Sequence, residues 1–219
     1  MSPRLPPSAS VAHDTGDGRL RAPSAARNAG AIADLLERAM KDRPASCALE
    51  IASGTGQHVV INAARLPHLT WQPTEVDPDR IASIDAHVRL AGLSNVRPAR
   101  MLDATRPGWS ADVTPQDLIL LANLLHLIPM PAVATLIEEA GRALAPGGTL
   151  ILYGPFMRNG NLTSEGDRRF HADLTGADPT IGYKSDADIA RLIAESGMTL
   201  EERVEMPANN LAFVGRRAL

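Results

Sequence analysis

The sequence predicts an α/β fold, in which a mostly parallel sheet carries helices on both faces. Short apolar runs near 47–51, 69–75, 96–101, 117–122 and 149–154 alternate with segments whose apolar residues recur at helical spacing. The run at 117–122 is almost continuously apolar, as in a central parallel strand that is covered on both faces. At 50–58 an acid ends one such run, and a glycine-containing loop leads into a helix. Regular alternation of this kind predicts parallel strands joined by crossover helices.

Size and charge exclude several classes of function. The chain has 219 residues, which suits one domain, and a net charge of −3 with Lys and Arg scattered along it. We therefore do not expect a nucleic acid as partner. No cluster of His, Cys, Asp and Glu has metal-ligand spacing, so no metal is expected. The oligomeric state is left open between monomer and homodimer.

Cys47, the length of the apolar runs and the N-terminus indicate the cellular compartment. Cys47 lies inside an apolar run, so it is interpreted as a core residue, and with no second cysteine an intrachain disulfide is excluded. No segment approaches the roughly 18 consecutive apolar residues of a membrane span, and the N-terminus lacks the apolar run of a signal peptide. These features favour a cytoplasmic protein without a membrane partner.

The chain divides into an arm and one domain. Residues 1–20 are rich in Pro, Ser and Gly and are expected to form a flexible arm, and residues 21–219 form the domain. A helix is expected over about 29–41, with Asn28 as its N-cap and Arg27 beside it. Capping alone would explain Asn28 but not Arg27, and both are candidates for lining a ligand cleft.

The remaining elements follow from periodicity and from stop signals. Asp77 is expected to cap a helix ended by Gly92, and Ser185 to open a capping box. The segment 155–184 departs from the alternation and is interpreted as an insertion that shapes a substrate pocket. We expect helices near 57–66, 78–91, 131–144 and 185–196, and a closing antiparallel pair at 199–205 and 211–216.

The loop after the first strand indicates a nucleotide-like ligand. Gly54 and Gly56 permit backbone conformations and a close ligand approach that a side chain would block, and the following helix directs free N–H groups at the loop. Glu50 precedes these glycines, which suits the ammonium and sulfonium of S-adenosylmethionine (SAM) and would repel a pyrophosphate. A dinucleotide site would also need a third glycine where Val59 stands.

The rest of the cofactor site is predicted from strand ends. Glu75 is placed to accept both ribose hydroxyls, with Asp77 as a competitor whose capping interpretation is stronger. Asp103 can accept the exocyclic amine of adenine, although a plain turn would also explain it. The predicted cofactor-binding residues are Glu50, Ala52, Ser53, Gly54, Gly56, His58, Glu75, Val76, Asp103, Ala104, Asn123 and Leu124.

The best candidate for a catalytic base follows the fourth strand. Methyl transfer from a sulfonium is an in-line displacement, so aligning the nucleophile is the main requirement and a base is supplementary. His126 is the best base candidate, although a packing role is as good an explanation. The other candidates, for shaping an acceptor pocket, are Arg27, Asn28, Tyr153, Phe156, Asn209 and Asn210, with His171 and Asp173 as weaker bases.

The segment Glu50-Ile51-Ala52-Ser53-Gly54-Thr55-Gly56 resembles the first motif of the class I SAM-dependent methyltransferases, with Ala52 where those enzymes usually have glycine. Together with the strings at 26–28, 71–75, 153–156 and 206–210, it resembles a family of small methyltransferase-like proteins of unknown function. The resemblance covers about 25–217 and implies a Rossmann-like fold with a seven-stranded sheet, a C-terminal antiparallel hairpin, and SAM binding. Gly182-Tyr183-Lys184-Ser185 departs from the glycine-apolar-arginine-aspartate string expected in that family.

The leading hypothesis is therefore a SAM-dependent methyltransferase with a small-molecule acceptor. The alternative is a SAM- or nucleoside-binding sensor or partner protein without catalysis. A nicotinamide oxidoreductase is disfavoured by Glu50 and Val59.

Overall fold

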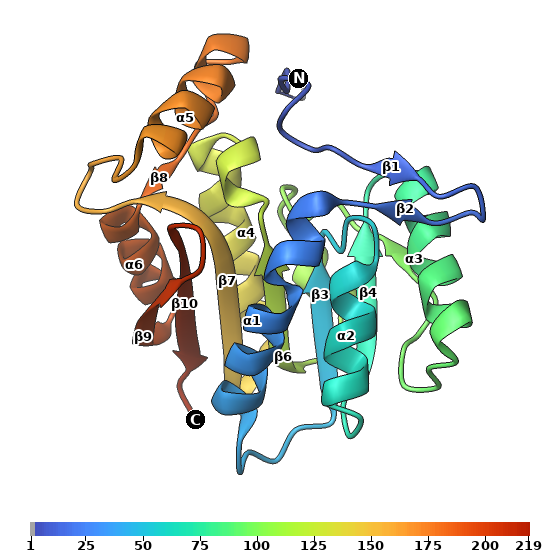
Figure 1. The fold of residues 1–219 in the computed structure, drawn as a ribbon. Coiled ribbons are helices and arrows are strands. Elements are labelled where there is room, and N and C mark those ends of the chain that lie inside the picture. The colour runs from blue at the N-terminus through green and yellow to red at the C-terminus, as the bar shows by residue number, and fades with distance from the viewer. Residues whose placement is uncertain (1–2) are drawn as a thin grey trace.

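The computed structural model describes residues 3–219 and shows a central sheet between two layers of helices (Figure 1). The strand order is β5-β4-β3-β6-β7-β10-β9, and the short β8 pairs with β7. Strands β5, β4, β3, β6 and β7 run parallel, whereas β10 is antiparallel to both β7 and β9. The expected α/β fold with a mostly parallel sheet and a C-terminal antiparallel hairpin is confirmed.

Most helices and strands lie close to their expected positions, but α5 and the start of β8 fall in the segment 155–184, where no helix or strand was expected. The main strands are β3 (Cys47–Ile51), β4 (Thr70–Glu75), β5 (Arg100–Met101), β6 (Gln116–Ala122), β7 (Leu144–Met157), β8 (Lys184–Ser185), β9 (Met198–Met206) and β10 (Asn210–Arg217). The helices are α1 (Pro23–Met40), α2 (Gln57–Arg65), α3 (Pro78–Ala91), α4 (Met130–Ala143), α5 (Glu165–Ala177) and α6 (Asp186–Glu195), with short 3-10 turns η1 (Trp109–Asp112) and η2 (Leu125–Leu127).

The two faces of the sheet carry separate cores because successive strand residues point to opposite sides. On β3, Ala48 packs in the core under α1, α2 and α3, and Leu49 packs in the core under α4 and α6. The α1 face also buries Trp71 of β4 and Tyr153 of β7. This alternation decides which side chains reach the α1 side of the sheet's carboxyl edge.

Two expected helix caps are wrong. The first helix begins at Pro23, and Ala22 is its N-cap, so Asn28 lies inside α1 and does not cap it. Proline in the first turn followed by alanines continues the helix further toward the N-terminus than the apolar stripe indicated. At α6 the Ser185 side chain makes no capping hydrogen bond. The reciprocal capping box lies instead at Ser164 and Asp167, where it opens α5.

The third helix has its expected ends, whereas the third predicted strand is shorter than expected. Asp77 caps α3 through the Asp79 N–H, and Gly92 ends that helix in the left-handed region, as expected. The third strand is shorter than 96–101: only Arg100 and Met101 pair regularly, and Val96 forms an isolated bridge with Trp71. Pro98 interrupts this segment because it has no N–H to donate.

The expected arm runs across the carboxyl edge of the parallel strands. A short hairpin of β1 (His13–Asp14) and β2 (Leu20–Arg21) lies over α3, and the chain before it extends toward α5 (Figure 1). The Arg4 N–H donates to Asp178, and Arg80 donates to Oγ of Ser10 at 2.6 Å. Among residues 3–219 no helix is both long and apolar enough for a bilayer crossing.

Candidate functional site

The loop between β3 and α2 is built from left-handed backbone positions. Ala52, Gly54 and Gly56 have φ of 52°, 59° and 93°. The Ser53 N–H donates to the Thr74 carbonyl at 2.8 Å, which ties the loop to the end of β4. A side chain at Gly56 is excluded, since its Cβ would lie 2.7 Å from Cα of Ile84 in α3. At Gly54 the nearest atom to such a Cβ is 3.7 Å away, so the loop is open there.

Glu50 is a buried carboxylate without a partner. It is 2% exposed, and neither of its carboxylate oxygens has a hydrogen-bond partner among the described residues. Burial, and secondarily the charge of Glu75, raise the pKa of Glu50 to about 8. A buried acid of this kind is stabilised by a nearby cation or hydrogen-bond donor. The geometry therefore fits a ligand with positive charge beside the loop.

Glu75 lies at the end of β4, next to the same loop. Its carboxylate accepts the Gly54 N–H at 2.9 Å and the Val76 N–H at 2.8 Å. These bonds fix the carboxylate against the loop, where lone pairs not used by the two N–H groups remain for a diol. Val76 itself is 52% exposed at the rim.

Asn28, His58 and Tyr153 meet beneath the start of α1. Nε2 of His58 lies 2.7 Å from Oδ1 of Asn28, and burial lowers the pKa of His58 to about 4, so the neutral ring donates. The Tyr153 side chain is 1% exposed, and its hydroxyl has no hydrogen-bond partner among the described residues. Burial raises its pKa, while Asn28, Asn210 and the Arg27 charge oppose the rise. The structure thus brings three candidates and an exposed cation together.

His126 lies in η2, directly after β6, and is 5% exposed. Its ring packs edge-on against Phe170 at 5.6 Å and Tyr183 at 6.3 Å between centroids. Burial, with a smaller effect of the Lys184 charge, lowers the pKa of His126 to about 3. His126 therefore does not titrate near neutral pH, as a general base in this position would.

Three residues beside His126 were not among the predicted site residues. Phe170 of α5, Tyr183 and Lys184 reach it only because the segment 155–184 folds back over the end of β7. Lys184 is 6% exposed, and its Nζ donates to the Gly182 carbonyl at 2.9 Å. The only sequence signal for Lys184 was the departure from the family string at 182–185.

Several predicted residues have ordinary structural contacts. The Asp103 carboxylate accepts the Thr105 N–H and hydroxyl, as a turn residue does. Phe156 packs on Phe213 in the α4 core, on the face opposite Tyr153, so it does not line the same pocket. Asp173 is exposed. Ala104 is buried, while Asn123 (φ 60°) and Leu124 are half-buried at the end of β6.

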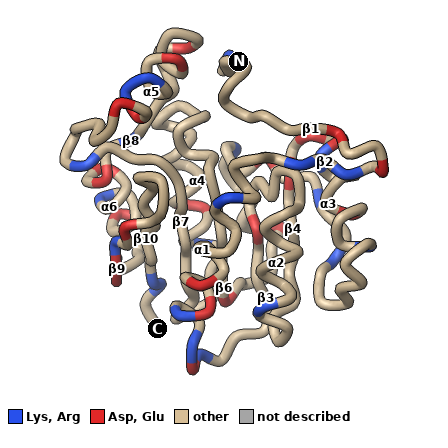
Figure 2. Tube along the Cα trace, viewed as in Figure 1, with Lys and Arg blue, Asp and Glu red and all other residues tan. Residues whose placement is uncertain are grey.

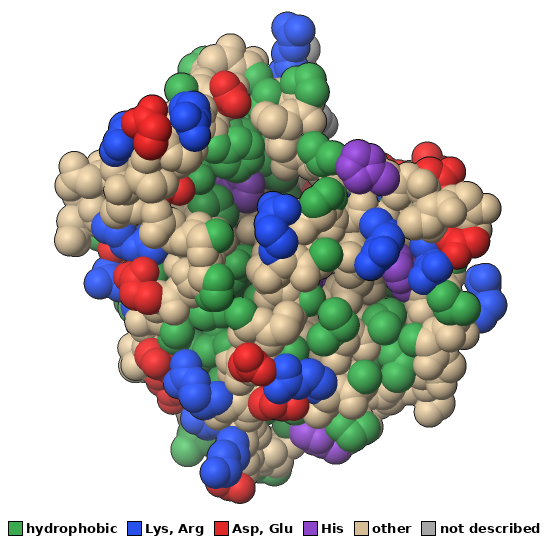
Figure 3. All heavy atoms as spheres, viewed as in Figure 1, with side chains coloured by type: hydrophobic (Ala, Val, Ile, Leu, Met, Phe, Trp, Pro, Cys, Tyr) green, Lys and Arg blue, Asp and Glu red, His purple; other side chains and the backbone are tan. Residues whose placement is uncertain are grey.

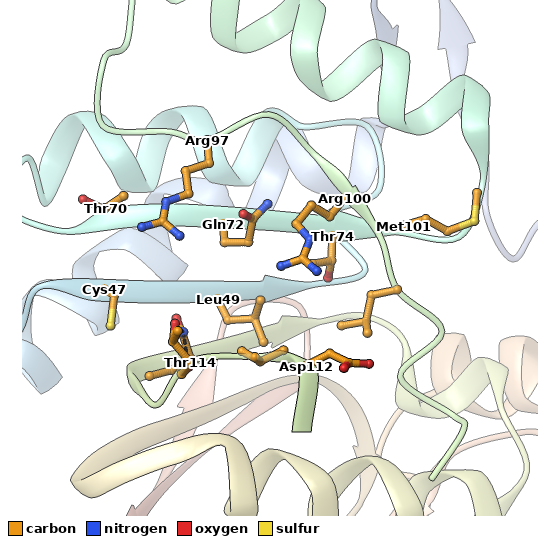
Figure 4. A pocket seen from close by; sticks show the side chains of 13 residues that line it. Cys47, Leu49, Thr70, Gln72, Thr74, Arg97, Arg100, Met101, Asp112 and Thr114 are labelled. Atoms are coloured by element: carbon orange, nitrogen blue, oxygen red, sulfur yellow. Dashed lines mark hydrogen bonds between the residues drawn. The ribbon is translucent and has the colours of Figure 1, made fainter. Parts of the chain in front are cut away.

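A separate cavity lies on the α4 face of the sheet, away from the glycine loop. The connection from β5 to β6 holds only η1, and a cavity of about 180 Å³ lies there, lined by residues that include Leu49, Gln72 and Thr74 (Figure 4). Cys47 lines this cavity at the start of β3, and burial raises its thiol pKa. The cysteine is therefore remote from the candidate site.

The family model described as "Protein of unknown function (DUF938)" matches residues 19–217. The chain belongs to the DUF938 family. That description fits the expectation of a family without an assigned function, and the shared length covers the domain that contains the candidate site.

Solved structures similar to this DUF938 protein are methyltransferases. An O-methyltransferase family protein from Burkholderia thailandensis matches with a TM-score of 0.76 and 16% identity over 89% of this chain and 57% of the other. A putative O-methyltransferase from Nostoc punctiforme matches with a TM-score of 0.76 and 17% identity over 88% and 56%. Human N-acetylserotonin methyltransferase in complex with SAM matches with a TM-score of 0.70 and 12% identity over 90% and 53%. The DUF938 chain thus spans little more than half of these proteins, and the likeness shows that it has the Rossmann-like methyltransferase fold.

Proposed function

We propose that the protein is a SAM-dependent methyltransferase with a small-molecule acceptor. The observation that carries the proposal is Glu50, a buried carboxylate with two unpartnered oxygens beside an open glycine loop. SAM supplies a positive charge for that carboxylate and a diol for Glu75, and it has no phosphate to be repelled. One similar structure is a complex with SAM and another, of PigF, is a complex with S-adenosylhomocysteine (SAH), which supports the choice of ligand.

The residues fit this cofactor at three places. The open space at Gly54 admits a ligand against the backbone, and Glu75 faces the same loop. Ser53, Ala52, Gly56 and His58 hold the loop and the start of α2 around it. Asp103, Ala104, Asn123 and Leu124 are proposed to border the adenine and the methionine portion at the ends of β5 and β6. When bound, SAM would supply an electrophilic methyl group.

The chain's own groups are proposed to align the acceptor. Asn28 accepts from His58 through Oδ1, which leaves its amide N–H groups for an acceptor molecule, and the buried Tyr153 hydroxyl is proposed to take part beside it. His126 is neutral, and it is proposed to orient a hydroxyl by hydrogen bonding more than to remove a proton at neutral pH. Alignment alone supplies a large share of the rate in such displacements. The segment 155–184 is proposed to shape the acceptor side.

Calorimetric titration of SAM and SAH tests the proposal, together with mass spectrometry of ligand released from the purified protein. We expect the wild type to bind and Gly54→Arg not to bind. For Glu75→Ala we expect the affinity to fall by at least roughly tenfold, since a hydrogen bond to a charged group is lost. Gly30→Arg is the matched control, because Gly30 is exposed in α1 with nothing near its Cβ position.

Unchanged SAM affinity in both site variants would refute the site assignment. Binding of SAM without methyl transfer to any member of a metabolite extract would favour the non-catalytic binding protein instead.

A further inference from the structure

A buried ammonium lies next to His126 without a counter-ion. Lys184 is 6% exposed, and its Nζ donates one hydrogen bond, to the Gly182 carbonyl. Among residues 3–219 it forms no ion pair. An ammonium carries three N–H donors, and burying one with a single carbonyl partner is costly. Burial lowers the pKa of Lys184 to about 8, so the ammonium is still the main form at neutral pH, and a further acceptor would stabilise it.

Among the described residues the Lys184 ammonium donates to the Gly182 carbonyl and to no side chain. His126 and His171 both have lowered pKa values, from burial first and from the Lys184 charge second, so both rings are neutral and neither supplies a negative charge. Nδ1 of His171 already accepts the Tyr183 N–H at 3.0 Å. The nearest acids have other partners. Asp167 accepts from the Tyr183 hydroxyl and from Ser164, and Asp186 pairs with Arg203 at 2.5 Å.

Lys184 connects directly to the candidate acceptor side. Its partner residue Gly182 donates its N–H to the His126 carbonyl at 3.0 Å, and β8 pairs with the end of β7. Rings of Phe170 and Tyr183 pack edge-on at 6.1 Å beside it. Figure 3 shows a hollow between α5 and the start of α1, with hydrophobic side chains and a histidine at its floor. Lys184 therefore lies directly beside the aromatic cluster of His126, Phe170 and Tyr183.

We propose that the acceptor is a small molecule bearing a carboxylate, which the Lys184 ammonium binds, with its apolar or aromatic body against Phe170 and Tyr183. The inference rests on the proposed function, because it assigns the substrate class of that same site. A carboxylate matches the site better than a phosphate does, since one ammonium balances the single charge of a carboxylate and leaves part of a phosphate's charge of up to about −2 unbalanced. Arg27, an exposed cation without an ion pair among the described residues, adds to the positive field of the cleft.

Calorimetry on the SAH-saturated protein tests this inference with benzoate, salicylate and phenylacetate, each compared with its amide. We expect the best carboxylate to bind about tenfold more tightly than its amide, as charge-assisted hydrogen bonds do. Lys184→Met should lose this preference while SAH affinity stays unchanged, and Lys184→Arg should keep it. Lys41→Met, at the exposed end of α1, is the matched control.

Two outcomes would overturn the inference. One is that no carboxylate of the panel binds more tightly than its amide, and another is that the preference survives in Lys184→Met. Thermal unfolding of each variant checks folding, and Lys184→Met should unfold at an equal or higher temperature because a buried charge is replaced by an apolar chain.

The two proposals fail in distinguishable ways. If neither SAM nor SAH binds but carboxylates bind through Lys184 to the free protein, the proposed function is refuted, and Lys184 remains a carboxylate-binding group in a protein of another function. If SAH binds and the carboxylate preference is missing, only the inference on the acceptor falls.

Discussion

At the scale of single residues, burial of Glu50 destabilises the charged form of its side chain, and a cationic ligand can offset that free energy. Its side chain is buried on the α1 face, opposite Pro73 in the β3–β4 register, where water does not reach it. Below its folded-state pKa of about 8 it is protonated and neutral, and above it an unpaired charge is buried. A cation beside the loop would stabilise the charged form at neutral pH.

A pH-dependence of stability follows for the protein without ligand. The folded pKa of Glu50 lies above its ordinary value of 4.5, so the folded state holds one more proton between these two values. Its contribution to stability is therefore complete below about pH 4.5 and is lost as the pH rises through about 8. We expect the free energy of unfolding to fall by about 1 kcal/mol per pH unit across this window. Urea unfolding at several pH values measures it.

Glu50→Gln should remove this slope, because the amide does not titrate. Glu202→Gln, at an exposed position of β9, should keep it. Parallel pH profiles for wild type and Glu50→Gln would show that Glu50 is not the group responsible.

Ala52 carries strain of a different kind. It occupies the left-handed region at φ 52°, at the position where the resembled methyltransferases usually have glycine. An alanine there costs roughly 1 kcal/mol relative to an unstrained conformation. The Ser53 N–H bond to Thr74 and the packing of α2 hold the loop in this conformation despite the cost.

At the scale of elements, the glycine loop depends on how closely α2 and α3 approach. Gly56 is the N-cap of α2, and Ile84 of α3 lies fully buried against it. Ser83 reinforces the contact by donating to the Thr55 carbonyl and accepting the Leu20 N–H. The loop, α3 and the arm therefore form one connected unit.

Gly56→Ala should disrupt this unit. The added Cβ would lie 2.7 Å from the Ile84 backbone, and the residue has φ of 93°. We expect a loss of roughly 2 to 4 kcal/mol in unfolding free energy and loss of SAM binding. Gly30→Ala in α1, where the Cβ meets open space, should instead stabilise by about 0.5 to 1 kcal/mol. Denaturant unfolding compares them, and equal effects of the two substitutions would contradict the packing argument.

At the scale of the whole molecule, the cleft lies between the arm and the segment 155–184. Ala9 packs against the cluster of Leu127, Leu174, Ile181 and Tyr183, while Ser10 is held by Arg80 beside Gly54. The arm thus contacts the cluster beside His126 and, through Arg80, the surroundings of the β3–α2 loop. Figure 2 shows Lys and Arg interspersed with Asp and Glu along the described trace.

Protection from trypsin should report on the arm. Arg4, Arg19 and Arg21 offer cleavage sites, and we expect SAH to slow cleavage there several-fold because it fills the cleft beneath the arm. Arg80→Gln should reduce that protection, since the Ser10 contact is lost. Arg100→Gln, which lines the separate cavity, is the control. Cleavage at the same rate with and without SAH would show that the arm does not respond to the ligand.

The sequence by itself determined the order of the main strands and of every helix except α5, because apolar periodicity and caps such as Asp77 and Gly92 are local signals. It also located the glycine loop and the acids at the ends of β3 and β4, since parallel strands bring their carboxyl ends to one edge. The two misassigned caps, at Asn28 and Ser185, arose where several local sequences satisfied the same capping rules.

Only the tertiary structure decided what surrounds each side chain. The unpartnered state of Glu50, the low pKa of His126 and the isolation of the Lys184 ammonium all result from burial by residues distant in sequence. Phe156 and Tyr153 lie on opposite faces by strand alternation, because β7 continues to Met157, past the expected end of that strand at 154. Burial and charge partnership depend on long-range packing, and for that reason the fold was predictable from local pattern while the electrostatics of the site was not.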